Sequence, residues 1–171
     1  MKTSYVSVSL SVAALMGALL TPALSLAAAK SQNMPVQAQV NANCNFTSTP
    51  SLTFPSYDPV GANATLPLDG SIVVNVRCTQ GATVQIGIDS GTHATGSSRA
   101  MQLGATTNRL VYDLYQDSLR TVPWTNSAPG WYTFTSLTNA PTPVPVYGRV
   151  PGGQDVPAGT YDDIVVVTVN Y

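Results

Sequence analysis

Few residues in this sequence could carry out acid–base or nucleophilic chemistry. His93 is the single histidine, it lies in a loop rich in glycine, serine and threonine, and no orienting partner stands near it in the sequence. The stretches nearest to a nucleophile elbow, residues 90–93 and 96–98, do not match Gly-x-Ser-x-Gly. Asp162 and Asp163 are adjacent, and adjacent side chains of a strand point to opposite faces, so they cannot converge on one substrate. The sequence therefore predicts no enzyme and no catalytic residues.

The N-terminus carries the pattern of a secretory signal peptide. Lys2 is followed by an apolar run and then by the small residues Ala27-Ala28-Ala29. A membrane anchor is the alternative, but the run is interrupted at Thr21-Pro22 and is shorter than the roughly 20 residues of a spanning helix. We expect residues 1–29 to be removed, with cleavage after Ala27 or Ala29, and one exported domain to remain.

Cys44 and Cys78 are the two cysteines of the chain. Export places them in an oxidising compartment, so we expect a disulfide between them, with two buried free thiols as the alternative. Two cysteines and His93 cannot supply the four ligands of a closed zinc site. No metal site is predicted.

Two other groups of side chains have more than one interpretation. Trp124 and Trp131, with Tyr132 and Phe134, could form an aromatic platform for a sugar, or could belong to the core or its rim. Arg99 and Arg109 each begin an apolar segment, and we expect structural ion pairs between them and nearby aspartates. The candidate partners are Asp89, Asp113 and Asp117.

Composition favours strands over helices. Charged residues make up 9% of the chain, glutamate is absent, and the only lysines are Lys2 and Lys30. Valine, threonine and tyrosine, which favour strands, are abundant. We therefore predict an all-β domain of seven to nine short strands, and the low positive charge makes nucleic acid an improbable partner. The clearest alternating segments are 71–78, 83–89 and 110–117, and residues 164–171 form one strongly β-branched strand.

The last predicted strand, Ile164–Tyr171, needs a partner on its open side. It is apolar and contains neither the charges nor the prolines that usually protect an exposed edge. At the other end of the mature chain, residues 34–44 alternate between apolar and polar side chains, which is a strand pattern. Either an earlier segment of the chain or another molecule is expected to cover the last strand.

Taken together, these landmarks resemble the spore coat U family, which includes the subunits of archaic, Csu-type chaperone–usher pili. The resemblance extends over most of the mature chain. The residues that carry it are Cys44, Leu52-Thr53-Phe54, Tyr57-Asp58-Pro59, Val76-Arg77-Cys78, Arg99-Ala100-Met101, Leu110–Asp117, Pro123-Trp124, Val146–Val150, Pro157–Asp163 and the closing Val167–Tyr171.

The resemblance implies an incomplete immunoglobulin-like β-sandwich, residues 44–171, that is completed by a donor strand from a neighbouring subunit. Residues 30–43 would be the donor extension, and joining subunits head to tail would generate a fibre. The implied donor side chains are Met34, Val36, Ala38, Val40 and Ala42. The implied acceptor groove contains Ile164, Val165, Val166, Val167, Val169 and Tyr171.

The same resemblance implies partners and a location. The partners are identical or homologous pilus subunits, a periplasmic chaperone and an outer-membrane usher, with no nucleic acid and no small-molecule cofactor. The protein would pass through the periplasm into an extracellular pilus, or fimbrium, that serves adhesion and biofilm formation. A spore or cell-surface coat protein without a true pilus, and a glycan-binding adhesin module, are the alternatives.

Overall fold

The computed structural model describes residues 27–48 and 50–171. The chain divides into two units, Met1–Ala38 and Gln39–Tyr171. In the first unit, residues 27–38 are exposed and form neither helix nor strand. Most of the predicted signal peptide, residues 1–26, lies outside the described residues. No helix in the described ranges is both long and apolar enough to cross a membrane.

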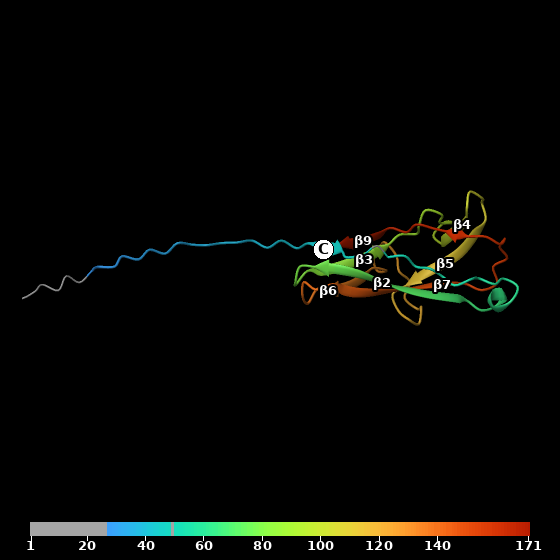
Figure 1. Ribbon diagram of the computed structural model, residues 1–171, viewed down its shortest axis with the longest axis horizontal. Coiled ribbons are helices and arrows are strands. Elements are labelled where there is room, and N and C mark those ends of the chain that lie inside the picture. Colours follow the sequence, from blue (N-terminus) through green and yellow to red (C-terminus); the bar gives the residue numbers. More distant parts are fainter. Residues whose placement is uncertain (1–26, 49) are drawn as a thin grey trace, which may run out of the picture. The chain divides into compact units, whose positions relative to one another are not determined.

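The described part of the second unit forms nine strands and one short 3-10 helix, which confirms the predicted all-β class (Figure 1). The elements are β1 (Cys44–Phe46), η1 (Ala62–Ala64), β2 (Leu68–Cys78), β3 (Thr83–Ile88), β4 (Arg99–Leu103), β5 (Arg109–Tyr115), β6 (Tyr132–Thr135), β7 (Thr142–Val150), β8 (Tyr161–Asp162) and β9 (Val167–Asn170).

The strands are arranged in two antiparallel sheets that share one core. The larger sheet has the order β1-β2-β7-β5-β4-β8, and the smaller has the order β6-β3-β9. Alternation decides which side chains are buried: Leu110, Tyr112 and Leu114 of β5 face inward, and the residues between them are half-buried. Side chains from both sheets form a single apolar cluster. The architecture is an immunoglobulin-like sandwich.

Proline restricts how β7 pairs with its neighbours. Pro143 and Pro145 lie opposite Asn75 and Val73 of β2, whereas β5 pairs with β7 only from Tyr147 to Arg149. The proline-containing half of β7 is therefore paired with β2 alone, as expected for residues that lack an N–H group.

The predicted continuous strand Ile164–Tyr171 is shorter in the structure. β8 pairs with β4 in the larger sheet, and β9 pairs with β3 in the smaller sheet. Residues 163–166 connect the two sheets and belong to no strand. The pattern of apolar residues indicated extended chain, but it could not indicate that the chain changes sheets here.

Candidate functional site: a groove between two strand edges

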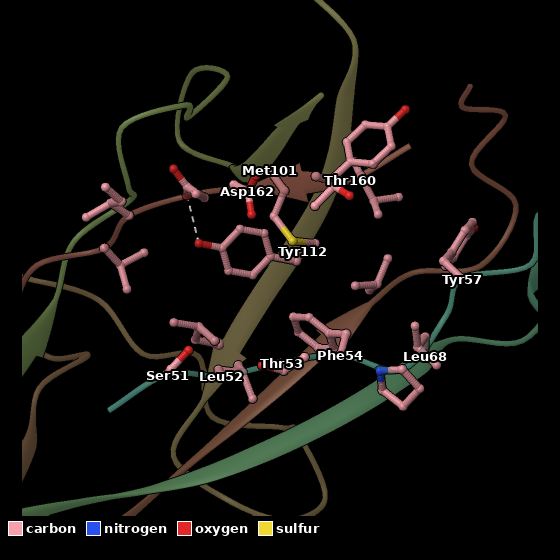
Figure 2. A pocket seen from close by; sticks show the side chains of 18 of the residues that line it. Ser51, Leu52, Thr53, Phe54, Tyr57, Leu68, Met101, Tyr112, Thr160 and Asp162 are labelled. Carbon is pink, nitrogen blue, oxygen red and sulfur yellow. Dashed lines mark hydrogen bonds between the residues drawn. The ribbon is translucent and has the colours of Figure 1, made fainter. Parts of the chain in front are cut away.

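A long apolar groove opens between β1 and β9. One hollow of about 840 Å³ lies among residues 50–57, β5 and residues 156–165 (Figure 2). A second hollow of about 470 Å³ lies between Phe46, Ser48 and Pro50 on one side and residues 164–167 on the other. Pro50, Ile164, Val165 and Val167 line both hollows, so the two adjoin along residues 164–167.

The first edge of the groove is β1. Asn43 accepts a hydrogen bond from the N–H of Thr79, and the N–H of Thr47 donates to the carbonyl of Asn75. Hydrogen-bonded and non-hydrogen-bonded pairs alternate in an antiparallel ladder, so Cys44 and Phe46 direct their backbone groups away from β2. Within the described residues of 39–171, no strand pairs with this side of β1.

The second edge is β9 and the residues before it. The N–H of Asp89 donates to the carbonyl of Val166 at 3.1 Å, so Asp89 and Val166 are a hydrogen-bonded pair. Hydrogen-bonded and non-hydrogen-bonded pairs alternate from there, so Ile88–Val167 and Ile86–Val169 are non-hydrogen-bonded pairs. Val167 and Val169 therefore direct their N–H and C=O groups away from β3. In the described part of residues 39–171, this side of β9 also has no strand partner.

The larger hollow is lined by both apolar and polar side chains, and an aromatic pair and a buried carboxylate lie at its floor. The ring of Phe54 packs edge-on against that of Tyr112, with 6.3 Å between the ring centroids. Burial raises the pKa of the Tyr112 hydroxyl well above its ordinary value, and the hydrogen bond to Asp163 adds to the shift. The hydroxyl thus stays protonated and donates to the Asp163 carboxylate at 2.8 Å. Other floor residues include Leu52, Leu68, Met101, Val146 and Val150.

Two glycines bring the segment before β2 close to the larger sheet. Gly70 and Gly148 face each other across β2 and β7, and the side chains of Leu52 and Phe54 lie directly on them. A Cβ atom at Gly148 would collide with both side chains. These glycines therefore allow Leu52 and Phe54 to pack onto the larger sheet and form part of the floor of the groove, although residues 52–54 form no strand.

The predicted acceptor residues differ in where they lie. Val165 and Val167 are half-buried, pack against the core and line the groove, and Val169 packs against the core farther along β9. Ile164 and Val166 line the groove mouth but are largely exposed. Tyr171 is exposed, and its hydroxyl contacts Asn43 at 3.5 Å.

The predicted donor residues are exposed. Met34, Val36 and Val40 have 81%, 84% and 82% of their surface accessible, and Ala38 and Ala42 are also exposed. Three large apolar side chains in an alternating segment are thus left uncovered in the single chain. Such a segment is typical of a surface that binds another molecule.

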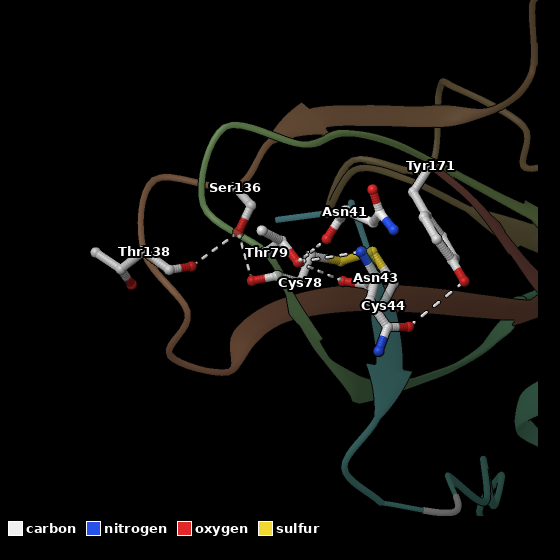
Figure 3. The surroundings of a disulfide bond; sticks show 8 residues. All are labelled: Asn41, Asn43, Cys44, Cys78, Thr79, Ser136, Thr138 and Tyr171. Carbon is white, nitrogen blue, oxygen red and sulfur yellow. Dashed lines mark hydrogen bonds between the residues drawn. A yellow bond between two sulfur atoms is a disulfide. The ribbon is translucent and has the colours of Figure 1, made fainter. Parts of the chain in front are cut away.

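The predicted disulfide joins Cys44 to Cys78 and attaches β1 to the end of β2 (Figure 3). The two residues are a directly opposed pair in the ladder, with Cα atoms 4.1 Å apart. Next to it, the backbone N–H of Asn43 donates to the Thr79 hydroxyl at 3.1 Å. The chain is therefore firmly held at the point where the predicted donor extension meets the domain.

Of the two interpretations of the aromatic residues, the structure places Trp124 in the core and not on a sugar platform. Trp124 is 0% exposed, and its indole N–H donates to the carbonyl of Ile86 at 2.9 Å. Its ring stacks on Tyr132 at 5.5 Å between centroids. Because Trp124 belongs to the core, it is not accessible to a sugar.

The predicted arginine–aspartate pairs are also wrong. Arg99 is buried and donates to three backbone carbonyls, those of Ile88, Asp89 and Trp124. Arg109 donates to backbone carbonyls in the same way, including that of His93. Both arginines therefore support loops rather than pair with carboxylates.

Sequence reasoning missed the partner of His93. Its Nδ1 atom lies 3.1 Å from the carbonyl oxygen of Asp162 and 3.2 Å from Oδ1 of Asp163, about seventy positions along the chain, and its ring is only partly exposed. Distance in sequence concealed this contact. A signal was available in the sequence: Tyr161 and Val165 each lie two positions from Asp163, so all three share one face of an extended chain. The apolar character of these two neighbours indicates that the aspartate lies at a buried position.

Membership of a family follows from comparison with known proteins. A family model described as the Spore Coat Protein U domain matches residues 30–168. The chain belongs to the spore coat protein U family. Protein U of Myxococcus xanthus is 38% identical to this chain over 156 residues, which are 85% of this chain and 87% of that protein.

A solved structure shows a similar fold. The crystal structure of the CsuC–CsuE chaperone–tip adhesion subunit pre-assembly complex, from archaic Csu pili of Acinetobacter baumannii, contains a chain that superposes with a TM-score of 0.55 at 20% identity, covering 77% of this spore coat U chain and 40% of that chain. A chaperone–tip adhesin complex of CFA/I fimbriae gives a TM-score of 0.47 at 13% identity, covering 75% and 41%. The present chain thus covers less than half of the length of either neighbouring chain.

Proposed function

We propose that this protein is a structural subunit of an extracellular pilus that is assembled by the chaperone–usher pathway through donor-strand exchange. The observation that carries the proposal is the groove, which is flanked by two strand edges with unpaired backbone groups. Residues 44–171 form the acceptor domain, residues 30–43 form the donor extension, and residues 1–29 are the signal peptide.

The occupant of the groove is the extension of a second copy or of a homologous subunit. Strand addition joins main-chain groups along an exposed edge, and alternate side chains enter the groove. The donor alternates as this requires, with Met34, Val36, Ala38, Val40 and Ala42 on one side. The hollow beside residues 164–167 is mainly apolar, as are these side chains. The free backbone groups are those of Cys44 and Phe46 on one edge and of Val165, Val167 and Val169 on the other.

Before assembly, a periplasmic chaperone occupies the groove, and an outer-membrane usher then exchanges it for the incoming subunit. An unfilled sandwich with two open edges would aggregate, so it needs such protection. The finished fibre lies outside the cell and supports surface adhesion and biofilm formation. No catalytic step and no cofactor are involved.

A coat protein deposited on a spore or cell surface without a true pilus is the second candidate. The similarity to Protein U of Myxococcus xanthus and the description of the family favour it. The donor-strand joint is common to both candidates, whereas a fibre exported by an usher belongs to the first alone. Genes for a chaperone and an usher beside this gene would distinguish the pilus subunit from the coat protein.

The test is expression of the mature protein in a bacterial periplasm, with and without residues 30–42, together with its cognate chaperone. Gel filtration and electron microscopy would measure assembly. We expect fibres from the complete mature chain and only monomeric or chaperone-bound protein from the truncated chain. A stable monomer in both cases would mean that the sandwich closes by itself.

A further inference from the structure

Asp163 lies at the point where the chain leaves the larger sheet and approaches the smaller one. Its side chain is only 2% exposed. One carboxylate oxygen accepts hydrogen bonds from the Thr92 hydroxyl and from the backbone N–H of His93, both at 3.0 Å. The other oxygen accepts from the Tyr112 hydroxyl at 2.8 Å. A buried carboxylate with three donors is well satisfied, so this side chain fixes its own segment in place.

The loop after β3 forms hydrogen bonds with the backbone of residues 163–166. Asp89 accepts the N–H of Val166 with its side chain at 2.8 Å and donates its own N–H to the Val166 carbonyl. The N–H of Thr92 donates to the carbonyl of Ile164 at 3.0 Å. Gly91 has φ +84°, and a side chain there would collide with the Asp163 carboxylate. Residues 89–93 thus hold residues 163–166 from one side.

This attachment decides which side of the segment is free. Ile164 and Val166 use their backbone groups toward residues 89–93, so Val165, between them, directs its N–H and C=O into the groove. Val167 and Val169 continue the same edge in β9. Residues 163–166 are therefore held as extended chain along the groove wall, although they form no ladder with β3.

We propose that Asp163 is a positioning residue for donor-strand acceptance, and that it holds the edge at Val165 in the extended form that an incoming strand requires. This inference rests on the proposed function. Once a donor strand is seated, its own ladder holds the edge, and the carboxylate network becomes redundant. Loss of the network should consequently slow association and leave dissociation nearly unchanged, because a smaller fraction of free domains is competent to bind.

The test uses the full mature chain carrying V36D and V40D, so that its own extension cannot fill a groove. A fluorescein-labelled peptide with the sequence of residues 30–43 is the probe, and stopped-flow anisotropy measures its association and dissociation rates. Thr92→Val and Thr92→Ala each remove the hydroxyl donor to Asp163 without removing the carboxylate, and Thr92 does not line the groove. Thr121→Val is the matched control, since its hydroxyl also donates to a carboxylate, that of Asp117, in an exposed loop.

Both test variants should associate more slowly, by up to the roughly tenfold that one lost hydrogen bond to a charged group allows, while their dissociation rates change by less than about twofold. The control should match its parent in both rates. Unchanged association in both test variants, or a loss of affinity confined to dissociation, would overturn the role of Asp163. If the parent chain binds no peptide at all, the proposed function itself fails, which is a distinguishable result.

Discussion

Replacing Val36 and Val40 with aspartate tests the donor-strand assignment most directly. Both side chains are more than 80% exposed in the single chain, so the substitutions should leave the folding of residues 44–171 unchanged. In a filled groove, each valine would be buried, and each burial contributes about 1.5–3 kcal/mol. The double variant therefore loses about 3–6 kcal/mol of binding free energy, which is roughly a 10²–10⁴-fold weaker joint.

The loss should be larger in practice, because two carboxylates would enter an apolar groove without partners. Fibre growth with the cognate chaperone is the assay, followed by electron microscopy and by the heat stability of subunit ladders on gels. The matched control is Gln37→Asp with Gln39→Asp, which adds the same charge at the intervening positions of the same segment. Long fibres from the valine variant, or an equal loss from the glutamine variant, would refute the assignment of the inward side chains.

Three further measurements test the stability of the domain. Reduction of the Cys44–Cys78 disulfide, which spans 34 positions, should lower the free energy of unfolding by about 3–4 kcal/mol in urea titrations, and an unchanged midpoint would contradict this. Hydrogen bonds from Arg149 lower the pKa of Asp69 in the folded protein. The contribution of this ionised pair to the free energy of unfolding is therefore complete above the unfolded-state pKa of Asp69. It is lost as the pH falls through the lower folded-state pKa. Asp69→Asn should remove this acid-side change, worth about 1 kcal/mol or less because the pair is exposed, when unfolding is measured from pH 7 to pH 2. Trp124→Ala should cost about 3–5 kcal/mol, since a fully buried ring is lost, and a cost below about 1 kcal/mol would place Trp124 outside the core.

Local alternation was sufficient to predict most of the strands. In β5, Leu110, Tyr112 and Leu114 recur at every second position, and these are the residues that the structure buries. The face of β2 that carries Val74, Val76 and Cys78 was predicted in the same way, and it brings Cys78 to Cys44. These predictions succeed because the two-residue period of a strand depends on neighbours in sequence alone.

Contacts between residues that are distant in the chain could not be predicted from the sequence. Arg99 was expected to pair with an aspartate, yet it donates to carbonyls of a loop and of the segment around Trp124. His93 was expected to be an isolated loop residue, yet Asp163 holds it. In both cases the partner is set by how loops from two sheets meet, and residue types do not specify that.

The sequence by itself determined the strand-rich composition, the disulfide partners, and an alternating apolar segment, which is exposed in the single chain. It also led to the hypothesis that the last apolar stretch needs a partner. Only the tertiary structure decided that this stretch changes sheets at residues 163–166, and that the backbone groups of Val165 and Val167 face a groove. The physical reason is that the free side of a strand depends on which groups on the other side are already bonded, and those groups, at Asp89 and Thr92, lie more than seventy positions earlier in the chain.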